Sequence, residues 1–430
     1  VRPASTEEVS KVVKLAITFK AKIVPVGGNT GLNGGTYSDD AISISMERMN
    51  KIHEVRLNSK IAIVEAGVIL TSLHQVANEN DLMFPLTFGA RGSATIGGVL
   101  STNAGGSNVL KYGNTRDLVL GVEIVLPSGE IMNLMSELHK DNSGYCLRDL
   151  VIGAEGTLGI ITQAVLKLFP KPKAYATAMI AVKSLENALS LLNELQDGTG
   201  GAVAAYEYMP KRYIQGYMEL SSASRKPFQK DYEHLVLVEL ETTVELFSRS
   251  GDDGQVLLSG ELESILNKNL NRDIILDAHI AQNEEQRLIM WERREAAAEI
   301  SLLRTPLINN DIAVPLDKVA KFFTIMEKKL PDLDPEADVL VVSHLGDGNV
   351  HYTVWPSKDD EKHKDKIMEA IENVVLKLGG SFSAEHGIGL SKLSSMDRRK
   401  DPVALEVMRQ IKNAIDPEGI MNPGKVLPKL

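Results

Sequence analysis

Two apolar, β-branched runs that flank a glycine-rich turn constrain the fold of this chain most. Residues 337–342 and 350–355 lie on either side of the Gly-Asp-Gly-Asn sequence at 346–349. With Asp-Gly as the two central residues, this segment predicts a β-hairpin closed by a tight turn. Counting back from that turn pairs His344 directly with His351, on one face of the hairpin.

The two paired histidines predict a metal site. Directly opposed residues have Cβ atoms about 5 Å apart, so both imidazoles could bind one ion. The pair Glu385-His386 lies in the glycine-rich sequence 383–389, where Glu385 would add an oxygen ligand and His386 could act as a base. The alternative is two half-exposed histidines and an unrelated Glu-His pair. The hairpin register and the glycine-rich context favour the metal site.

Composition narrows the class of protein. The 430 residues allow two or three domains, and 47 Lys and Arg against 57 Asp and Glu give a net charge of −10. No cluster of basic residues is dense enough for a nucleic-acid partner. We also find no apolar run of membrane-spanning length.

The single Cys146 excludes an intrachain disulfide, fits a reducing compartment, and is expected to be a small packing residue. The chain opens on Val1 and not Met, so we expect its natural start to be missing. We expect a cytoplasmic location, or the mitochondrial matrix in a eukaryote.

Glycine-rich tracts at 27–35, 89–106 and 153–162 mark the first part of the chain. Ordered glycines cost backbone entropy, and close approach of backbone N–H groups to a pyrophosphate is one reason to keep them. The sequence has no G-x-G-x-x-G, Walker A or G-x-S-x-G motif, which argues against nicotinamide dehydrogenases, NTPases and α/β-hydrolases. Each tract alone could be a set of tight turns. Together they suggest an elongated ligand lying across one domain.

The elements expected around them are helices at 9–20 and 71–80 and strands at 22–26, 41–46, 61–68, 118–126 and 131–134.

The composition changes after Pro170-Lys171-Pro172-Lys173, which is typical of a linker. Beyond it, strands alternate with helices in a pattern that suits an antiparallel sheet. We expect strands at 177–182 and 233–242, helices at 185–196 and 284–300, a helix with an apolar stripe over 367–378, and a solvated loop at 251–254.

Several motifs occur in an order that resembles one known family. They are Pro25-Val-Gly-Gly-Asn-Thr-Gly31, Thr95-Ile-Gly-Gly98, Gly153-Ala-Glu-Gly-Thr-Leu-Gly159, the hairpin sequence 344–351, Glu385-His-Gly387 and Asn422-Pro-Gly-Lys425. The chain resembles the FAD-linked 2-hydroxyacid dehydrogenases of the vanillyl-alcohol-oxidase type, in the branch with D-2-hydroxyglutarate and D-lactate dehydrogenases. The resemblance covers essentially the whole chain, although the family has further N-terminal residues.

The resemblance implies an α+β fold. It comprises a two-part FAD-binding domain (1–170), an antiparallel-sheet cap domain with the metal site (171–395), and a C-terminal segment (396–430) that returns to the flavin. FAD would be bound without a covalent link, since Asn29 or Thr30 stands where related flavoproteins carry a covalently attached histidine. The implied FAD-binding residues are Pro25, Gly27, Gly28, Asn29, Thr30, Gly31, Leu32, Thr95, Gly97, Gly98, Ser101, Asn103, Gly105, Gly106, Glu155, Gly159, Ile161 and Asn422.

The resemblance also implies the reaction. A D-2-hydroxy acid would be oxidised to the 2-oxo acid, with hydride transfer to flavin N5 and electrons passed to a quinone or to a protein such as electron-transfer flavoprotein. The implied metal ligands are His344, His351 and Glu385, a set that suits Zn²⁺ and is compatible with Mn²⁺, Co²⁺ or Fe²⁺. His386 would be the base, and Arg294 would bind the substrate carboxylate. On pattern alone, Arg294 could equally be a solvated charge on a helix face. A homodimer would fit the family.

Three positions depart from the 2-hydroxyglutarate enzymes. Ala298, Asn309 and Thr353 stand where those enzymes have threonine, lysine and asparagine, which help to bind the distal carboxylate. Losing the cation removes a strong interaction, so lactate or malate is at least as good a candidate substrate as 2-hydroxyglutarate. The alternatives are a flavin oxidase that uses oxygen, a metallohydrolase using His344, His351 and Glu385, and a non-catalytic flavin- or metabolite-binding protein.

Overall fold

The chain divides into two compact units. The computed structural model describes residues 1–220, 223–251 and 254–429. The first unit comprises Val1–Gly106, Tyr112–Lys171 and Glu385–Leu430, and the second comprises Ser107–Lys111 and Pro172–Ala384. Residues 385–395, which the sequence analysis assigned to the cap domain, are therefore part of the first unit. The loop expected at 251–254 includes 252–253, which are outside the described residues.

The first unit is built on an antiparallel five-stranded sheet. Its buried central strands are apolar, as in the Val-Leu-Gly-Val-Glu-Ile-Val sequence of β6. In spatial order the strands are β3 (Ile52–Arg56), β4 (Ile61–Glu65), β8 (Ile160–Lys167), β6 (Val119–Val125) and β7 (Ile131–Leu134). The other strands described in this unit are β1 (Ile23–Val26), β2 (Ile42–Ser45), β5 (Leu82–Met83) and β9 (Phe169–Pro170).

Helices pack around this sheet. In α1 the Ser5 hydroxyl caps the helix by accepting a hydrogen bond from the Glu8 N–H, and Val9 and Val13 are buried. The helices are α1 (Thr6–Phe19), α2 (Leu70–Glu79), α3 (Ile96–Thr102), α5 (Leu147–Val151), α13 (Leu393–Arg399) and α14 (Pro402–Ile415), with 3₁₀ turns η1 (Gly89–Gly92) and η2 (Thr115–Leu118). Cys146, expected to be a packing residue, is exposed just before α5. That prediction was wrong because the residue precedes the buried part of its helix.

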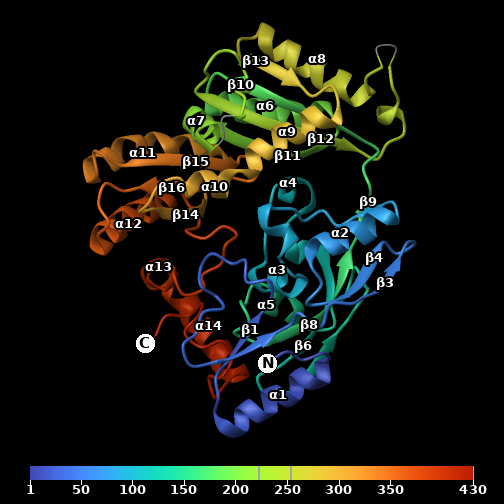
Figure 1. The fold of residues 1–430 in the computed structure, drawn as a ribbon, viewed down its shortest axis with the longest axis vertical. Helices are drawn as coiled ribbons and strands as arrows, with labels where there is room; N and C mark the ends of the chain where they lie inside the picture. The colour runs from blue at the N-terminus through green and yellow to red at the C-terminus, as the bar shows by residue number, and fades with distance from the viewer. Residues whose placement is uncertain (221–222, 252–253, 430) are drawn as a thin grey trace. The chain divides into compact units, whose positions relative to one another are not determined.

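The C-terminal segment belongs to the first unit although it is distant in sequence. In Figure 1, α14 lies beside strands from the first part of the chain. Met421 forms a parallel bridge with Ile23 of β1. The Lys412 ammonium group donates to the carbonyls of Thr157 and Met421, at 2.7 and 2.8 Å. These bonds hold the last residues against the third glycine tract.

The second unit is a seven-stranded sheet within the described residues, and every pairing in it is antiparallel. In spatial order its strands are β13 (Ile275–Ile280), β10 (Ala174–Val182), β12 (His234–Thr242), β11 (Val203–Pro210), β15 (Asp338–His344), β16 (Asn349–Trp355) and β14 (Ile308–Ala313). Three short segments lie outside the sheet: the helix α4 (Val109–Tyr112) and the 3₁₀ turns η3 (Leu246–Ser248) and η4 (Leu316–Lys318).

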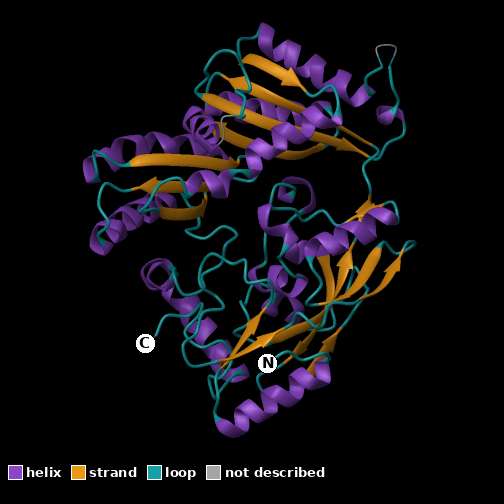
Figure 2. Cartoon of the chain, viewed as in Figure 1, coloured by secondary structure: helices purple, strands orange, loops and turns teal. Residues whose placement is uncertain are grey.

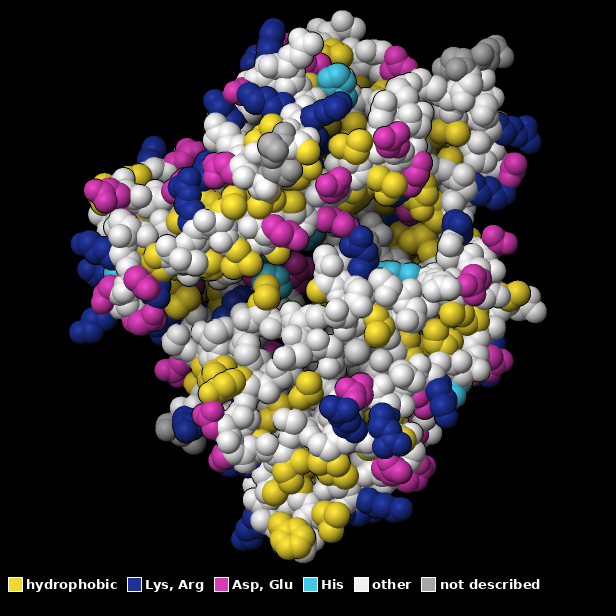
Figure 3. All heavy atoms as spheres, viewed as in Figure 1, with side chains coloured by type: hydrophobic (Ala, Val, Ile, Leu, Met, Phe, Trp, Pro, Cys, Tyr) yellow, Lys and Arg dark blue, Asp and Glu magenta, His cyan; other side chains and the backbone are white. Residues whose placement is uncertain are grey.

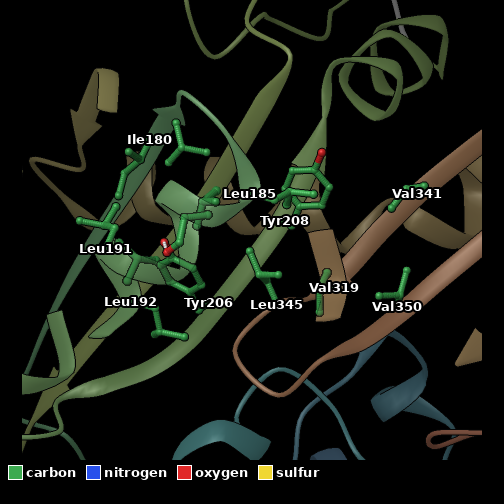
Figure 4. Packing of buried hydrophobic residues seen from close by; sticks show 14 of the residues in the cluster. Ile180, Leu185, Leu191, Leu192, Tyr206, Tyr208, Val319, Val341, Leu345 and Val350 are labelled. Carbon is green, nitrogen blue, oxygen red and sulfur yellow. Dashed lines mark hydrogen bonds between the residues drawn. The ribbon is translucent and has the colours of Figure 1, made fainter. Parts of the chain in front are cut away.

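Helices cover both faces of this sheet (Figure 2). One face packs against α6 (Leu185–Gly198), α8 (Leu257–Asn271), α11 (Val319–Leu333) and α12 (Glu361–Lys377). Figure 4 shows Leu191 and Leu192 of α6 beside Tyr206 in this cluster. The other face packs against α7 (Lys211–Leu220), α9 (Glu284–Glu295) and α10 (Ala297–Ser301). Strand residues alternate between the two faces of a sheet, so the nearly continuous buried runs of β10, β11 and β12 make both faces apolar.

The histidine hairpin forms, but its register differs from the prediction. His344 pairs with Asn349, and His351 pairs with Val342, so the loop has residues 345–348 and the direct pairing of His344 with His351 is wrong. Within this loop Gly348 has φ +81°, and a Cβ there would lie 2.2 Å from the Val314 carbonyl oxygen. The two histidines are diagonal neighbours on one face, with ring centroids 5.4 Å apart.

The surface carries charges of both signs. On the face shown in Figure 3, Lys and Arg side chains are interspersed with Asp and Glu, without a broad basic area. Within the described ranges, every helix is too short or too polar to cross a bilayer.

Candidate active site

The first two glycine tracts are in direct contact in the first unit. A Cβ on Gly27 would lie 2.3 Å from the Thr95 hydroxyl oxygen, and one on Gly28 would lie 1.9 Å from the Ser93 carbonyl oxygen. At these distances, neither glycine can be replaced by a residue with a Cβ unless neighbouring atoms shift. The glycines therefore allow the backbones of the two tracts to approach each other.

The third tract joins them. The backbone N–H of Glu155 donates to the Ser101 carbonyl at 2.8 Å, and a Cβ on Gly156 would lie 2.5 Å from the Pro25 ring. The side-chain amide of Asn422 donates to the carbonyls of Glu155 and Gly35, at 2.7 and 3.0 Å. All three tracts and Asn422 thus lie together, as expected for one elongated ligand.

Two observations test whether this cradle suits a polar ligand such as FAD. Among the described residues, the buried Thr95 hydroxyl and the Asn422 side-chain oxygen have no hydrogen-bond partner. Leaving a buried polar group unpaired costs about 1–3 kcal/mol. Gly31 is also exposed, has no positive φ, and would place a Cβ in open space. Neither packing nor backbone conformation requires glycine at position 31. A ligand that approaches the backbone closely would explain the glycine, so this position fits a binding site.

Other predicted cofactor residues have contacts within the protein. Gly97 lies against Ala66, Gly106 against the Thr87 carbonyl and Gly159 against Ile124, and Gly98 lies close to Thr95. The Ser101 hydroxyl donates to the Gly97 carbonyl, Asn103 accepts from the Arg116 N–H, and Gly105 is buried. The Ile161 side chain is in the hydrophobic core. Asn29 and Leu32 are exposed and Thr30 is half-buried, with Asn29 accepting from the Thr36 hydroxyl.

The loop that carries Glu385 and His386 is held by two residues of the glycine tracts. The side-chain amide of Asn33 donates to the carbonyls of His386 and Gly387, at 3.0 and 2.7 Å. The Glu155 carboxylate accepts the backbone N–H groups of Ile388 and Gly389, both at 2.7 Å. Burial outweighs these bonds and raises the pKa of Glu155. Asn33 was not predicted as a site residue, and Glu155 was predicted only as a cofactor-binding residue, without this contact.

In the second unit, Glu207 connects His344 to Arg294. The Glu207 carboxylate on β11 lies 2.8 Å from Nδ1 of His344 and 2.6 Å from Nε of Arg294. Burial alone would raise the pKa of Glu207, but the positive charges of Arg294 and His344 outweigh it and lower the pKa. Arg294 is only 7% exposed, so it is not a solvated charge on a helix face. Glu207 could have been noticed as the single charged residue in the apolar strand Val203–Pro210.

Asp311 and His351 are further side chains of the second unit that could bind a metal ion beside His344. Asp311 pairs with His351 across β14 and β16, and its carbonyl accepts the N–H of Ala384, the residue before Glu385, at 3.2 Å. The ring of His344 neighbours that of His351. Asp311 was not predicted as a site residue, because only strand pairing brings it next to His351.

Comparison with known proteins agrees with the cradle in the first unit. The FAD binding domain family matches residues 1–135, and the family "FAD linked oxidases, C-terminal domain" matches residues 171–426. The chain is 33% identical to the mitochondrial D-2-hydroxyglutarate dehydrogenase of Arabidopsis thaliana, covering 99% of this chain and 74% of that protein. It is 32% identical to a mitochondrial D-lactate dehydrogenase homologue of Schizosaccharomyces pombe, covering 99% and 80%.

A solved structure has the same fold. The structure of p-cresol methylhydroxylase with bound substrate matches with a TM-score of 0.76 and 16% identity, covering 99% of this chain and 88% of that one. The vanillyl-alcohol-oxidase-type fold predicted from the sequence is confirmed, and so is the prediction of FAD as the cofactor. The chain belongs to the family of FAD-linked oxidases.

Proposed function

We propose that this protein oxidises a D-2-hydroxy acid to the 2-oxo acid, with FAD as hydride acceptor and a divalent ion beside the substrate. One observation carries the proposal: Asn33 and Glu155 of the glycine tracts hold the loop with Glu385 and His386, so a carboxylate and an imidazole are fixed beside the proposed FAD cradle. The names of the D-2-hydroxyglutarate dehydrogenase and D-lactate dehydrogenase relatives support the substrate class.

His344, His351 and Glu385 are the proposed metal ligands, and Asp311 is paired with His351 in the sheet. Two imidazoles and a carboxylate suit Zn²⁺, and the same set accepts Mn²⁺, Co²⁺ or Fe²⁺. His344 can act as a ligand because a donor bond from Nδ1 to Glu207 leaves the lone pair on Nε2 for an ion. Metal analysis of the purified protein identifies the ion.

Two side chains of the protein act on the substrate. When bound, the flavin supplies a hydride acceptor and the ion supplies a Lewis acid that lowers the pKa of the substrate hydroxyl. His386 takes the hydroxyl proton, since an imidazole can change protonation state near neutral pH. Arg294 binds the substrate carboxylate, and Glu207 fixes the plane of its guanidinium group through Nε.

The residues near the hairpin favour a small acid. Thr353 donates to the side-chain oxygen of Asn309 at 2.9 Å, so these neighbouring residues of β16 and β14 satisfy each other. Neither supplies a cation for a second carboxylate. Lactate, which has no second carboxylate, is therefore at least as good a candidate as 2-hydroxyglutarate, and malate is the shorter dicarboxylate to compare with both.

Anaerobic mixing of the purified protein with D- and L-2-hydroxy acids tests the proposal. We expect a D-acid to bleach the flavin absorption and the L-acid to have little effect, and we expect prior treatment with a chelator to slow the bleaching. Flavin that stays oxidised with every acid would refute the proposal. Faster turnover with oxygen than with a dye acceptor would instead indicate an oxidase, and a colourless protein would favour a metallohydrolase.

The mode of FAD attachment, the electron acceptor and the location are further parts of the proposal. We propose dissociable FAD, because Asn29 and Thr30 offer no imidazole for a covalent bond. Yellow chromophore that remains on the chain after denaturation would refute this.

A quinone or an electron-transfer flavoprotein is the proposed electron acceptor. Location in the cytoplasm or the mitochondrial matrix stays a prediction, and so does a homodimer.

A further inference from the structure

We infer that Glu207 is a positioning residue that sets the orientation of both His344 and Arg294. This inference rests on the proposed function, in which those two residues bind the metal ion and the substrate. Glu207 touches neither the ion nor the substrate in this account. It acts through its two partners.

One carboxylate reaches both partners because of where the strands place it. Glu207 on β11 pairs directly with His344 on β15. Arg294 comes from α9, which packs on the same face of the sheet. Each oxygen of Glu207 has its own partner: Oε1 lies 2.8 Å from His344 Nδ1, and Oε2 lies 2.6 Å from Arg294 Nε. Glu207 is fully buried, so water does not compete for these bonds.

The bond to His344 selects one tautomer of the imidazole. A carboxylate accepts hydrogen bonds, so Nδ1 of His344 must carry the proton and Nε2 must carry the lone pair. A metal ion binds that lone pair. In metal sites, a carboxylate on the second ring nitrogen fixes the ring and raises its basicity, and its loss typically lowers metal affinity about 10- to 100-fold.

The ion pair between Glu207 and Arg294 reduces charge repulsion at the proposed metal site. Nη2 of Arg294 lies 3.4 Å from both ring nitrogens of His344. A guanidinium so close to a metal-binding imidazole repels a divalent cation. The negative charge of Glu207 offsets that repulsion and keeps the guanidinium in a fixed plane. The same carboxylate therefore allows an arginine and a metal ion to occupy neighbouring positions.

A purely structural role is the alternative, and the chain contains a matched example of one. Glu239 on β12 is also buried, and it also binds an arginine of α9, Arg287, through two bonds of 2.7 Å. Its other partners are Trp291 and Thr177, so it contacts no histidine in the described bonds. If Glu207 only anchored α9 to the sheet, it would behave as Glu239 does.

The test compares Glu207→Gln with Glu239→Gln in the FAD-loaded protein. Affinity for Zn²⁺ is measured by competition with a chelator, the ligand field by the visible spectrum of bound Co²⁺, and stability by urea unfolding. We expect both variants to lose stability. We expect Glu207→Gln to bind Zn²⁺ about 10- to 100-fold more weakly and to shift the Co²⁺ spectrum, and Glu239→Gln to keep wild-type values for both. Glu207→Asp, which retains the charge on a shorter side chain, should recover part of the affinity and provides the test if Glu207→Gln does not fold.

The outcomes separate this inference from the proposed function. Wild-type Zn²⁺ affinity in Glu207→Gln, or equal losses in the two glutamine variants, would overturn the positioning role alone. If the wild-type protein binds no divalent ion, or if His344→Ala binds Zn²⁺ as tightly as the wild type, the proposed metal site itself fails.

Discussion

Single residues of the candidate site could be predicted from the sequence where they lie in a recognisable motif. His386 beside Glu385 in a glycine-rich loop, and a histidine on each side of a turn, are visible in the sequence. The partners that hold them are not. Asn33 is separated from His386 by 353 positions, and Glu207 from His344 by 137. No local pattern encodes contacts over such distances, so only the fold reveals them.

Arg294→Lys tests the arginine assigned to the substrate. A lysine cannot donate a planar pair of hydrogen bonds, so we expect kcat/KM for the best D-2-hydroxy acid to fall about 10- to 100-fold, mainly through a higher KM. Steady-state kinetics with a dye acceptor measure this. Arg287→Lys, on the same helix but bound to Glu239, is the control and should keep wild-type kinetics. Equal KM values in both variants would count against the assignment.

Asp334 gives a prediction on pH and stability. Burial would raise its pKa, but hydrogen bonds from His363, Ser357 and Glu336 outweigh burial and lower the pKa from 3.8 to about 2. A carboxyl whose pKa is lowered on folding stabilises the protein above its unfolded pKa, and this stabilisation is lost as the pH falls toward the folded pKa. After screening by nearby solvent, it amounts to about 1–2 kcal/mol at neutral pH.

Asp334→Asn should therefore destabilise the protein by about 1–2 kcal/mol at neutral pH, and by less at about pH 3. Urea unfolding of wild type and variant at both pH values measures the difference. A difference that stays constant, or grows, as the pH falls would contradict the assignment.

Whole elements were predictable from periodicity, but their ends and loops were not. The helix expected over 284–300 is interrupted between α9 and α10, where the Tyr213 hydroxyl donates to the carbonyls of Arg293 and Arg294. A continuing helix would use those carbonyls internally. In the hairpin, the Asp-Gly pair correctly predicts a turn but not its length. The N–H of Gly346 donates to the Tyr206 carbonyl on another strand, and such a contact has no local signal.

Gly348→Ala tests the hairpin loop. Its φ is +81°, and a Cβ would lie 2.2 Å from the Val314 carbonyl oxygen, so we expect a loss of about 2–4 kcal/mol in the free energy of unfolding. Gly200→Ala is the control, since Gly200 has φ +62° and open space around its Cβ position. Its loss should be about 1–2 kcal/mol. Equal losses in urea unfolding would show that the contact with Val314 is unimportant.

Asn33→Ala tests the loop that carries the proposed base. Without the bonds to the His386 and Gly387 carbonyls, the loop should be less protected. We expect faster hydrogen–deuterium exchange over 386–391 and a lower kcat in protein that still binds FAD. Asn80→Ala removes a comparable bond to the Val76 carbonyl elsewhere in the first unit and should alter neither. Unchanged exchange in Asn33→Ala would mean that Glu155 alone holds the loop.

At the scale of the whole molecule, the order of the motifs predicted the fold better than any single motif. Glycine tracts, hairpin and Glu-His pair are each ambiguous alone, but their order matches one family. Each unit has its own core, with one around β4, β6 and β8 and the other around β10, β11 and β12. The exact division of the chain was less accessible, because the return of Glu385 to the first unit depends on bonds to Asn33 and Glu155.

The most direct measurement is the rate of anaerobic flavin reduction by a saturating D-2-hydroxy acid in the wild type and in Glu385→Gln, both loaded with FAD and supplied with Zn²⁺. Glutamine removes the ligand charge while preserving the size of the side chain. We expect rapid bleaching in the wild type and bleaching at least about 100-fold slower in Glu385→Gln, a loss of about 3 kcal/mol of transition-state stabilisation. Bleaching at the same rate in both proteins would contradict a metal-assisted oxidation.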